Sequence, residues 1–266
     1  GGKNWIVKPS MSDKGQGIRV FRTIEQLQNI FDEFDEESDD EDSKDEAKEE
    51  GKKKNGIILS QLRHFIVQEY KDSPLLLPQY GNKKFHLRVY VVASGDLKVY
   101  VYKKVLTLFA SSKFVKPTAS DDHSTEIAIE GHLTNTCLQE NEVPLVVGFD
   151  DLEGIDVSKK KTILDQVCEI TGDVFKAAAS VDKMNFQPLS NGCEIYGVDF
   201  LVDDSFDVTL LEVNAYPDFK QTGDELKGLV HGLFVDYFEV VRELMGGSKY
   251  EGKALELVLD QKSHGW

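Results

Sequence analysis

Two neighbouring apolar segments near the end of the chain constrain its fold more than any other feature. Residues 197–202 read G-V-D-F-L-V, and residues 208–217 read V-T-L-L-E-V-N-A-Y-P. Both are rich in strand-forming residues, and Asp203, Asp204 and Ser205 between them favour a turn. The pattern therefore predicts an antiparallel hairpin whose side chains alternate between two faces.

Three polar side chains interrupt these apolar strands. Glu212 and Asn214 stand two residues apart, so they share a face, and Asp199 on the neighbouring strand can project onto it too. Two carboxylates and an amide oxygen make a hard, all-oxygen site that suits Mg²⁺ held between a protein and nucleotide phosphates. The alternative is an ordinary solvated strand face, and the hairpin alone does not decide between the two.

A strand with one lysine opens the chain, and a glycine-containing loop follows it. Residues 5–9 read W-I-V-K-P, and the loop 10–17 ends in G-Q-G before a second strand at 18–21. Glycine lets backbone amides approach phosphate oxygens closely, and Lys8 would add a positive charge. A plain hairpin turn is the alternative. The P-loop pattern is absent, and the glycines do not open a helix as they do in Rossmann folds.

Basic and apolar side chains alternate in K-F-H-L-R-V-Y-V-V, which begins at Lys84. Lys84, His86 and Arg88 therefore share one face of a predicted strand. Three basic groups in a row repel one another unless an anion such as a nucleotide phosphate lies between them. Upstream, the predicted strand 65–71 leads into the proline-bounded segment 74–78, which suits a hinge whose backbone reads an adenine edge.

Seven motifs in this order resemble the tubulin–tyrosine-ligase-like branch of the ATP-grasp enzymes. They cover almost the whole chain apart from residues 32–56, and the likeness is greatest to fungal members associated with P-bodies. The resemblance implies a carboxylate–amine ligase, in which ATP phosphorylates a carboxylate and an amine then attacks the acyl phosphate. The motifs are W-I-V-K-P, G-x-G-I, Q-x-Y, K-F-x-L-R-V-Y, H-L-T-N at 132–135, G-x-D-F-L-V-D and L-L-E-V-N-A-x-P.

The resemblance implies which residues hold ATP, the expected cofactor. Its phosphate-binding lysine corresponds to Lys8, and its flexible lid loop contains Gly15 and Gly17. The other nucleotide contacts that it implies, beginning with the adenine hinge, are Gln68, Glu69, Tyr70, Lys84, Thr134 and Asn135.

The resemblance also implies catalytic and metal-binding residues. Arg88 corresponds to a residue that contacts the reaction intermediate, and His86 stands beside it, so these two are the expected catalytic residues. The ligands of the expected Mg²⁺ correspond to Asp199, Glu212 and Asn214.

Two positions depart from the family pattern. The family has aspartate where His86 stands, and it usually has arginine where Leu108 stands in the segment 103–110. That arginine is expected to steady the phosphoryl group or the substrate carboxylate, which leucine cannot do, and a nearby lysine lacks the planar fork of arginine. ATP binding is therefore better supported than ligase turnover.

The expected fold is α+β, an ATP-grasp with the nucleotide between a small β-rich lid domain and a larger antiparallel sheet backed by helices. We place the lid at 1–71, and the larger subdomain with the metal and substrate side at 72–266. Apolar residues recur at helical spacing in 159–179 and 224–245, which are the predicted helices. The acidic segment 32–55 lacks apolar periodicity and is expected to be a disordered surface insertion.

Charge and composition argue against several classes of protein. The acidic segment carries half of the formal net charge of −16, and the rest of the chain is also negatively charged. A negative folded surface repels the phosphates of nucleic acids, so we do not expect it to bind them. The sequence contains no run of about 18 apolar residues, which is the length that a membrane-spanning helix requires. The three cysteines form no C-x-x-C pattern, so we expect neither disulfides nor zinc, and a cytoplasmic location.

Three functions remain open. One is an active ATP-dependent ligase that adds an amino acid to a peptide or protein. A second is an ATP-binding module that has lost turnover and works through partners, for which the resemblance suggests mRNA-decapping proteins in P-bodies. A nucleotide-independent scaffold, the third, leaves the basic row and the carboxylates unexplained. The acidic segment has its own alternative, which is to recruit basic partners.

Overall fold

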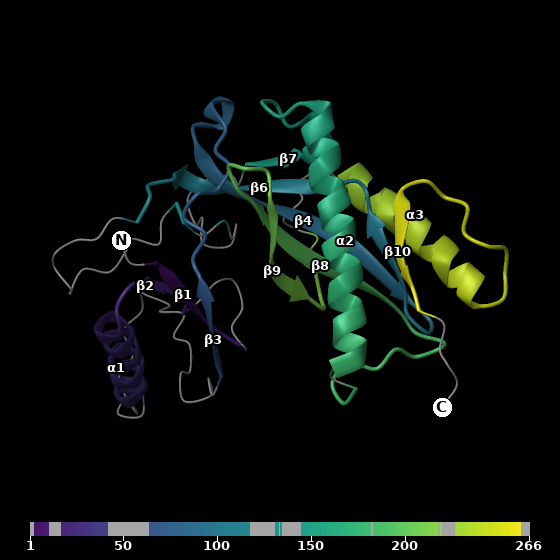
Figure 1. Cartoon of the computed structure of the whole chain (residues 1–266). Helices are drawn as coiled ribbons and strands as arrows, with labels where there is room; N and C mark the ends of the chain where they lie inside the picture. The colour runs from purple at the N-terminus through teal and green to yellow at the C-terminus, as the bar shows by residue number, and fades with distance from the viewer. Residues whose placement is uncertain are drawn as a thin grey trace, which may run out of the picture.

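The computed structural model has two lobes, each built on an antiparallel β-sheet (Figure 1). No helix in the described part of the chain combines the length and the apolar character needed to cross a bilayer. The residues that the structure describes are 3–10, 17–41 (of which 35–41 by their backbone alone), 64–117, 131–132, 134, 145–181, 183–217, 219 and 227–261.

The smaller lobe is a three-stranded sheet with one helix. Strand β1 (Trp5–Pro9) lies in the middle, between β2 (Arg19–Phe21) and β3 (Phe65–Glu69). Helix α1 (Ile24–Glu41) packs against this sheet. The small apolar core between them contains Val7, Phe21, Ile30 and Phe34.

Helix α1 extends into the acidic segment that is expected to be disordered. Its first turn is capped, because the Thr23 hydroxyl accepts a hydrogen bond from the Gln26 N–H at 3.2 Å and the Gln26 Oε1 accepts one from the Arg22 N–H at 2.8 Å. We expected the segment 32–55 to be disordered, but the backbone stays helical to Glu41. Glutamate is a good helix former, so propensity continues the helix where apolar periodicity ends. Residues 42–55 lie outside the described residues.

The larger lobe is a seven-stranded sheet centred on β4 (Lys83–Ser94). Strand β8 (Cys193–Val202) runs along one side of β4, while β5 (Lys98–Tyr102) and β6 (Leu106–Lys113) share the other side. The remaining strands extend the sheet outward from β8, β5 and β6 respectively: β9 (Val208–Asn214), β10 (Leu255–Asp260) and β7 (Val146–Gly148).

Two long helices cover opposite faces of this sheet (Figure 1). Val89 of β4 belongs to the core closed by α2 (Val157–Val181), and its neighbour Tyr90 to the core closed by α3 (Lys227–Leu244). The predicted helices and the predicted hairpin, β8 and β9, are therefore confirmed. Two short 3₁₀ helices complete the described elements: η2 (Pro78–Tyr80) and η4 (Phe149–Asp151).

A matched pair of glycine substitutions tests how closely α2 packs on the sheet. A Cβ at Gly172 in α2 would lie 3.0 Å from the carbonyl oxygen of Val258 in β10, whereas a Cβ at Gly228 in α3 would meet nothing within 4 Å. We expect Gly172→Ala to lower the free energy of unfolding by about 1–3 kcal/mol through overpacking. Gly228→Ala should raise it by about 0.5–1 kcal/mol, because alanine loses less backbone entropy in a helix. Urea unfolding measures both, and changes of the same sign would contradict the close packing.

Candidate functional site

A buried ion pair joins the two central strands of the larger sheet. Arg88 of β4 lies directly opposite Asp199 of β8. The guanidinium donates two hydrogen bonds to the carboxylate, from Nε to Oδ1 at 2.5 Å and from Nη2 to Oδ2 at 3.0 Å. Burial raises the pKa of Asp199, and the charge and hydrogen bonds of Arg88 oppose that rise. Each group therefore depends on the other for its polar contacts.

Gly197 leaves the space in which the Arg88 side chain lies. A Cβ at this position would be 3.4 Å from Cδ of Arg88 and 3.0 Å from Cβ of Pro217. Gly197 precedes Asp199 by two residues, so it lies on the same face of β8. Because Gly197 has no side chain, the Arg88 guanidinium on β4 can pass over it and reach the Asp199 carboxylate on β8.

Glu212 and Asn214 of β9 continue the polar row. Asp199 lies opposite Glu212 in the register of the hairpin, and the Asn214 amide donates to Oε1 of Glu212 at 3.4 Å, so these side chains do share a face. No group of three or more His, Cys, Asp and Glu side chains in the described ranges is placed to hold a metal alone. Two carboxylates and one amide oxygen fit Mg²⁺ whose other ligands come from phosphates and water.

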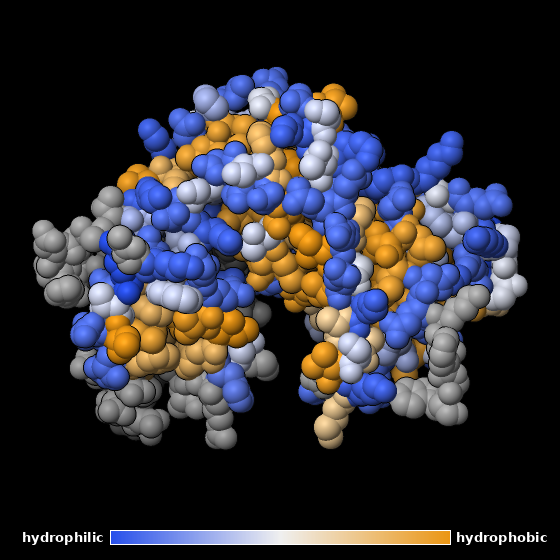
Figure 2. Space-filling view, viewed as in Figure 1, coloured by the Kyte–Doolittle hydropathy of each residue, from blue (hydrophilic) through white to orange (hydrophobic). Residues whose placement is uncertain are grey.

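Two lysines bring positive charge to this row from both lobes. Burial lowers the pKa of Lys8 in the lid sheet, while the nearby Glu212 and Asp199 raise it. Burial lowers the pKa of Lys84 on β4 to about 8, and Lys8 contributes to this shift. With Arg88, three cationic side chains face two carboxylates, so an anion such as a phosphate would balance the charge. Figure 2 shows that the molecule is hollowed between the two lobes.

Tyr70, which directly follows β3, connects the expected hinge to β4. Lys84 Nζ donates to the Tyr70 hydroxyl at 3.2 Å, and that hydroxyl lies 2.7 Å from Nδ1 of His132. Burial, with a contribution from Lys84, lowers the pKa of His132 to about 4, so its neutral imidazole can accept a hydrogen bond from the Tyr70 hydroxyl. The backbone N–H of Tyr70 donates to the Asn4 carbonyl at 2.9 Å, so this group is already engaged within the protein.

His86 is a buried, neutral histidine. Its Nδ1 lies 2.5 Å from the Thr134 hydroxyl, and its Nε2, 3.8 Å from Oδ1 of Asp199, has no hydrogen-bond partner among the described residues. Burial, followed by the charge of Arg88, lowers its pKa to about 3. Leu108 lies directly opposite His86 on β6 and is also buried. The two departures from the family pattern are therefore neighbours in space.

Some predicted residues stand apart from this group. Glu69 directs its exposed carboxylate to Lys3, at 2.8 Å, and Gln68 pairs with Ile6 inside the lid sheet. Gly17 has a φ of 72°, which glycine adopts without strain, whereas Gly15 and Asn135 lie outside the described residues. The predicted residues that the structure brings together are Lys8, Tyr70, Lys84, His86, Arg88, Thr134, Asp199, Glu212 and Asn214.

Sequence reasoning did not single out two residues that shape the site. His132 stands in the H-L-T-N motif, but nothing local to that motif indicates that its ring meets Tyr70. Gly197 begins one of the strand motifs, and its role depends on a side chain from another strand. Both depend on contacts between residues far apart in the chain.

A family model described as "Tubulin-tyrosine ligase family" matches residues 2–247. A "Probable tubulin--tyrosine ligase PBY1" from Saccharomyces cerevisiae is 52% identical over 244 residues, which cover 88% of this chain and 32% of that protein. A probable tubulin–tyrosine ligase from Schizosaccharomyces pombe is 47% identical, over 87% of this chain and 56% of that protein. The chain therefore spans about a third of one relative and about half of the other.

A solved structure is similar across almost the whole chain. The C-terminal domain of Pby1 from K. lactis superposes with a TM-score of 0.68 and 44% identity, covering 98% of this chain and 63% of that one. It is described as an ATP-grasp enzyme interacting with the mRNA decapping enzyme Dcp2. The expected α+β ATP-grasp fold is thereby confirmed.

Removal of Arg88 should make stability depend on pH. We expect Arg88→Met to lower the free energy of unfolding by about 3–5 kcal/mol at pH 8, because it leaves the Asp199 carboxylate buried and unpaired. Burial raises the pKa of Asp199 in the folded state, so the folded variant binds a proton more tightly than the unfolded chain. Stability should therefore fall as the pH rises, and the loss should be smaller at pH 5.

Chemical denaturation at both pH values measures this loss. The control is the double variant Arg88→Met with Asp199→Asn, which has no buried charge to neutralise and should recover much of the stability at pH 8. Equal losses at pH 5 and pH 8, with no recovery in the double variant, would contradict the assignment of a buried, mutually dependent pair.

Proposed function

Because this chain belongs to the tubulin–tyrosine ligase family, we propose that it binds Mg²⁺–ATP between its two sheets and acts as a carboxylate–amine ligase. The observation that supports this most is the meeting of Lys8 from the lid with Lys84 and Arg88 from β4, beside the carboxylates of Asp199 and Glu212. In a chain with a formal net charge of −16, this local excess of cations favours phosphate binding.

Each side chain has a role in this proposal. Lys8 and Lys84 would hold phosphate oxygens, and the Tyr70 hydroxyl would fix the direction of Lys84. Asp199 holds the Arg88 guanidinium in place, so that it can stabilise negative charge on an acyl phosphate without reorganising.

The metal side of the proposal rests on the polar row of the hairpin. Asp199, Glu212 and Asn214 would hold Mg²⁺, which when bound neutralises phosphate charge. The donor set of carboxylate and amide oxygens matches the preference of this cation. The acceptor would be a carboxylate on a peptide or protein, and the donor amine an amino acid.

A second function is favoured by the pair of His86 and Leu108. Both are buried and uncharged where a charged aspartate and arginine are expected, so the site offers less stabilisation to the transferred phosphoryl group. An ATP-binding module with impaired turnover would then work through partners. The reported interaction of the K. lactis relative with Dcp2 supports mRNA-decapping proteins as partners, in cytoplasmic decay bodies.

Mg²⁺–ATP should stabilise the fold, and this effect should depend on Glu212. At 100 times its dissociation constant, a ligand adds about 2.7 kcal/mol to the free energy of unfolding. Glu212→Gln should lose this gain while changing the stability of the free protein little, because Glu212 is exposed. Asp204→Asn, an equal charge change in the turn before β9, is the control and should keep the gain. Thermal melts with and without Mg²⁺–ATP measure it. An unchanged wild-type melt would contradict the proposal.

Restoring the family charges should raise turnover, provided that both are restored together. Leu108→Arg alone would bury an unpaired charge opposite neutral His86, and we expect a loss of about 3 kcal/mol or more. With His86→Asp added, the two charges would face each other, and much of this loss should be recovered. ADP formation with amino acids and peptides should rise by about 10²–10³ in the double variant. Robust ligation by the unmodified chain would instead favour the active ligase.

A further inference from the structure

Strand β9 is an open edge of the larger sheet, beside the proposed site. In the described part of the chain it pairs with β8 on one side and with no strand on the other. Every residue of β9 is at least partly exposed, whereas residues 197–202 of β8 are buried. An edge strand turns the N–H and C=O groups of alternate residues outward, where another strand can pair with them.

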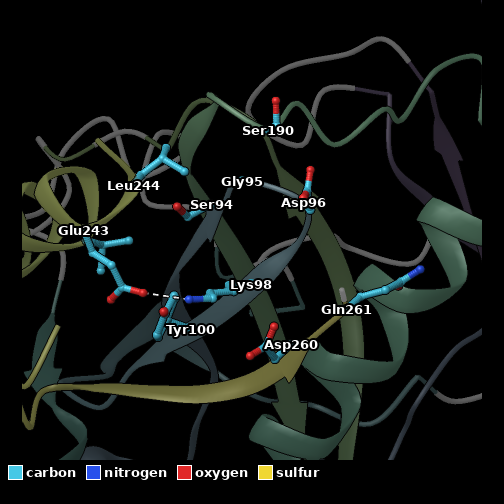
Figure 3. Close-up of a pocket in the computed structure, with 11 residues that line it drawn as sticks. Ser94, Gly95, Asp96, Lys98, Tyr100, Ser190, Glu243, Leu244, Asp260 and Gln261 are labelled. Carbon is cyan, nitrogen blue, oxygen red and sulfur yellow. Dashed lines mark hydrogen bonds and ion pairs between the residues drawn. The ribbon is translucent and has the colours of Figure 1, made fainter. Parts of the chain in front are cut away.

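The other two edge strands among the described residues of this sheet are protected against such pairing. Strand β7 has three residues, and β10 carries the carboxylates of Glu256 and Asp260. Figure 3 shows the end of β10 beside the ion pair of Lys98 with Glu243. Short length and charged side chains are common protections of an edge. Strand β9 has seven residues, and its one charged side chain, Glu212, belongs to the site.

The hollow between the two lobes gives a further strand access to β9. Figure 2 shows apolar side chains on the wall of this hollow, where β8 and β9 lie in Figure 1. Val213 of β9 has 40% of its surface exposed. Gln166 of α2 engages the start of the strand, where its Oε1 accepts a hydrogen bond from the Val208 N–H at 3.0 Å. Residues 209–214 therefore form an edge that leads to the site.

The last residues of β9 meet the charged groups of the site. An extra residue at Leu211 shifts the register, so that Glu212 lies opposite Asp199, which pairs with Arg88. Lys8 of the smaller sheet is close to both carboxylates. A strand parallel to β9 would bring its C-terminal carboxylate to these cations, whereas an antiparallel one would bring its amino group. The excess of cationic side chains favours the parallel direction.

We propose, on the basis of the ligase function proposed above, that an extended peptide pairs in parallel with the free edge of β9 and presents its C-terminal carboxylate as the acceptor. Leu210 and Val213 lie opposite Phe200 and Val198 of the α2-side core, so they share one face of the sheet. Every second side chain of the added strand lies on that face, so the peptide carries apolar residues at alternate positions. A run of acidic residues would be repelled by a chain of net charge −16.

Isothermal titration calorimetry without nucleotide tests this docking with the peptide acetyl-Lys-Val-Thr-Val-Ser-Leu. We expect saturable 1:1 binding. Replacing the C-terminal carboxylate by an amide should raise Kd by about tenfold or more, because hydrogen bonds to a charged group are lost. An unchanged Kd for the amide would overturn the parallel docking.

Two N-methylated forms of the peptide test the strand pairing itself. Methyl groups on alternate amides remove the donors that face either β9 or the solvent. One form should therefore lose binding, and the other should keep it. Equal effects of the two methylation patterns, or no saturable binding of the unmodified peptide, would overturn the proposal.

Hydrogen exchange and a matched pair of variants locate the peptide. The amides of residues 209–214 should become protected when it binds, and those of β10 should not. Val213→Asp places a carboxylate beside the peptide and should raise Kd by about tenfold or more. Leu257→Asp makes the same change on β10, where Leu257 is 47% exposed, and should leave Kd unchanged. Absence of protection in β9, or equal effects of the two variants, would contradict the docking.

Peptide binding without nucleotide separates this docking from the binding of ATP. If Mg²⁺–ATP fails to stabilise the fold but the peptide binds as expected, the ligase function is overturned and the docking stands. If Mg²⁺–ATP stabilises the fold but the peptide does not protect β9, the docking alone is overturned. Hydrogen exchange on the unmodified chain decides the outcome even if Val213→Asp does not fold.

Discussion

The rest of the site depends on the pairing of Arg88 with Asp199. Buried ion pairs add little to net stability, because desolvation of both charges offsets their attraction. Their stronger effect is on geometry. This pair joins β4 to β8 at the point where β9 adds Glu212 and β1 of the smaller sheet adds Lys8, so both of these charged groups lie close to it. Gly197 makes the pairing possible by leaving the guanidinium room.

The two histidines of the site are neutral, which limits the repulsion among its cationic side chains. Burial, followed by the charge of cationic neighbours, lowers the pKa of both His86 and His132, so neither adds to the repulsion among Lys8, Lys84 and Arg88. His132 instead accepts a hydrogen bond from the Tyr70 hydroxyl. The same hydroxyl accepts one from Lys84 on the larger sheet, and this second bond connects the end of the smaller sheet to β4. Tyr70, Lys84 and His132 are therefore parts of one hydrogen-bonded unit.

Patterns local in the sequence predicted β1 to β4, the β8–β9 hairpin with its polar row and the two long helices, because period-two and helical spacing determine which side chains share a face. They did not predict β5, β6, β7 and β10. The family resemblance predicted the two-sheet arrangement. Contacts between distant residues were not predictable in this way, including the Tyr70–His132 bond and the space at Gly197. The helical start of the acidic segment, up to Glu41, was missed for another reason, since glutamate propensity continues a helix beyond its apolar stripe.

The opposition of His86 and Leu108 across β4 and β6 has an evolutionary consequence. An arginine gained first would lie buried without a counter-ion, and an aspartate gained first would face a leucine in an apolar cluster. Both single steps pass through a less stable protein, although the doubly changed one need not be less stable. Because each single substitution lowers the stability, a change from the neutral pair to the charged pair requires both substitutions together. Homologues are therefore expected to carry either both neutral residues or both charged residues at these two positions, rather than one of each.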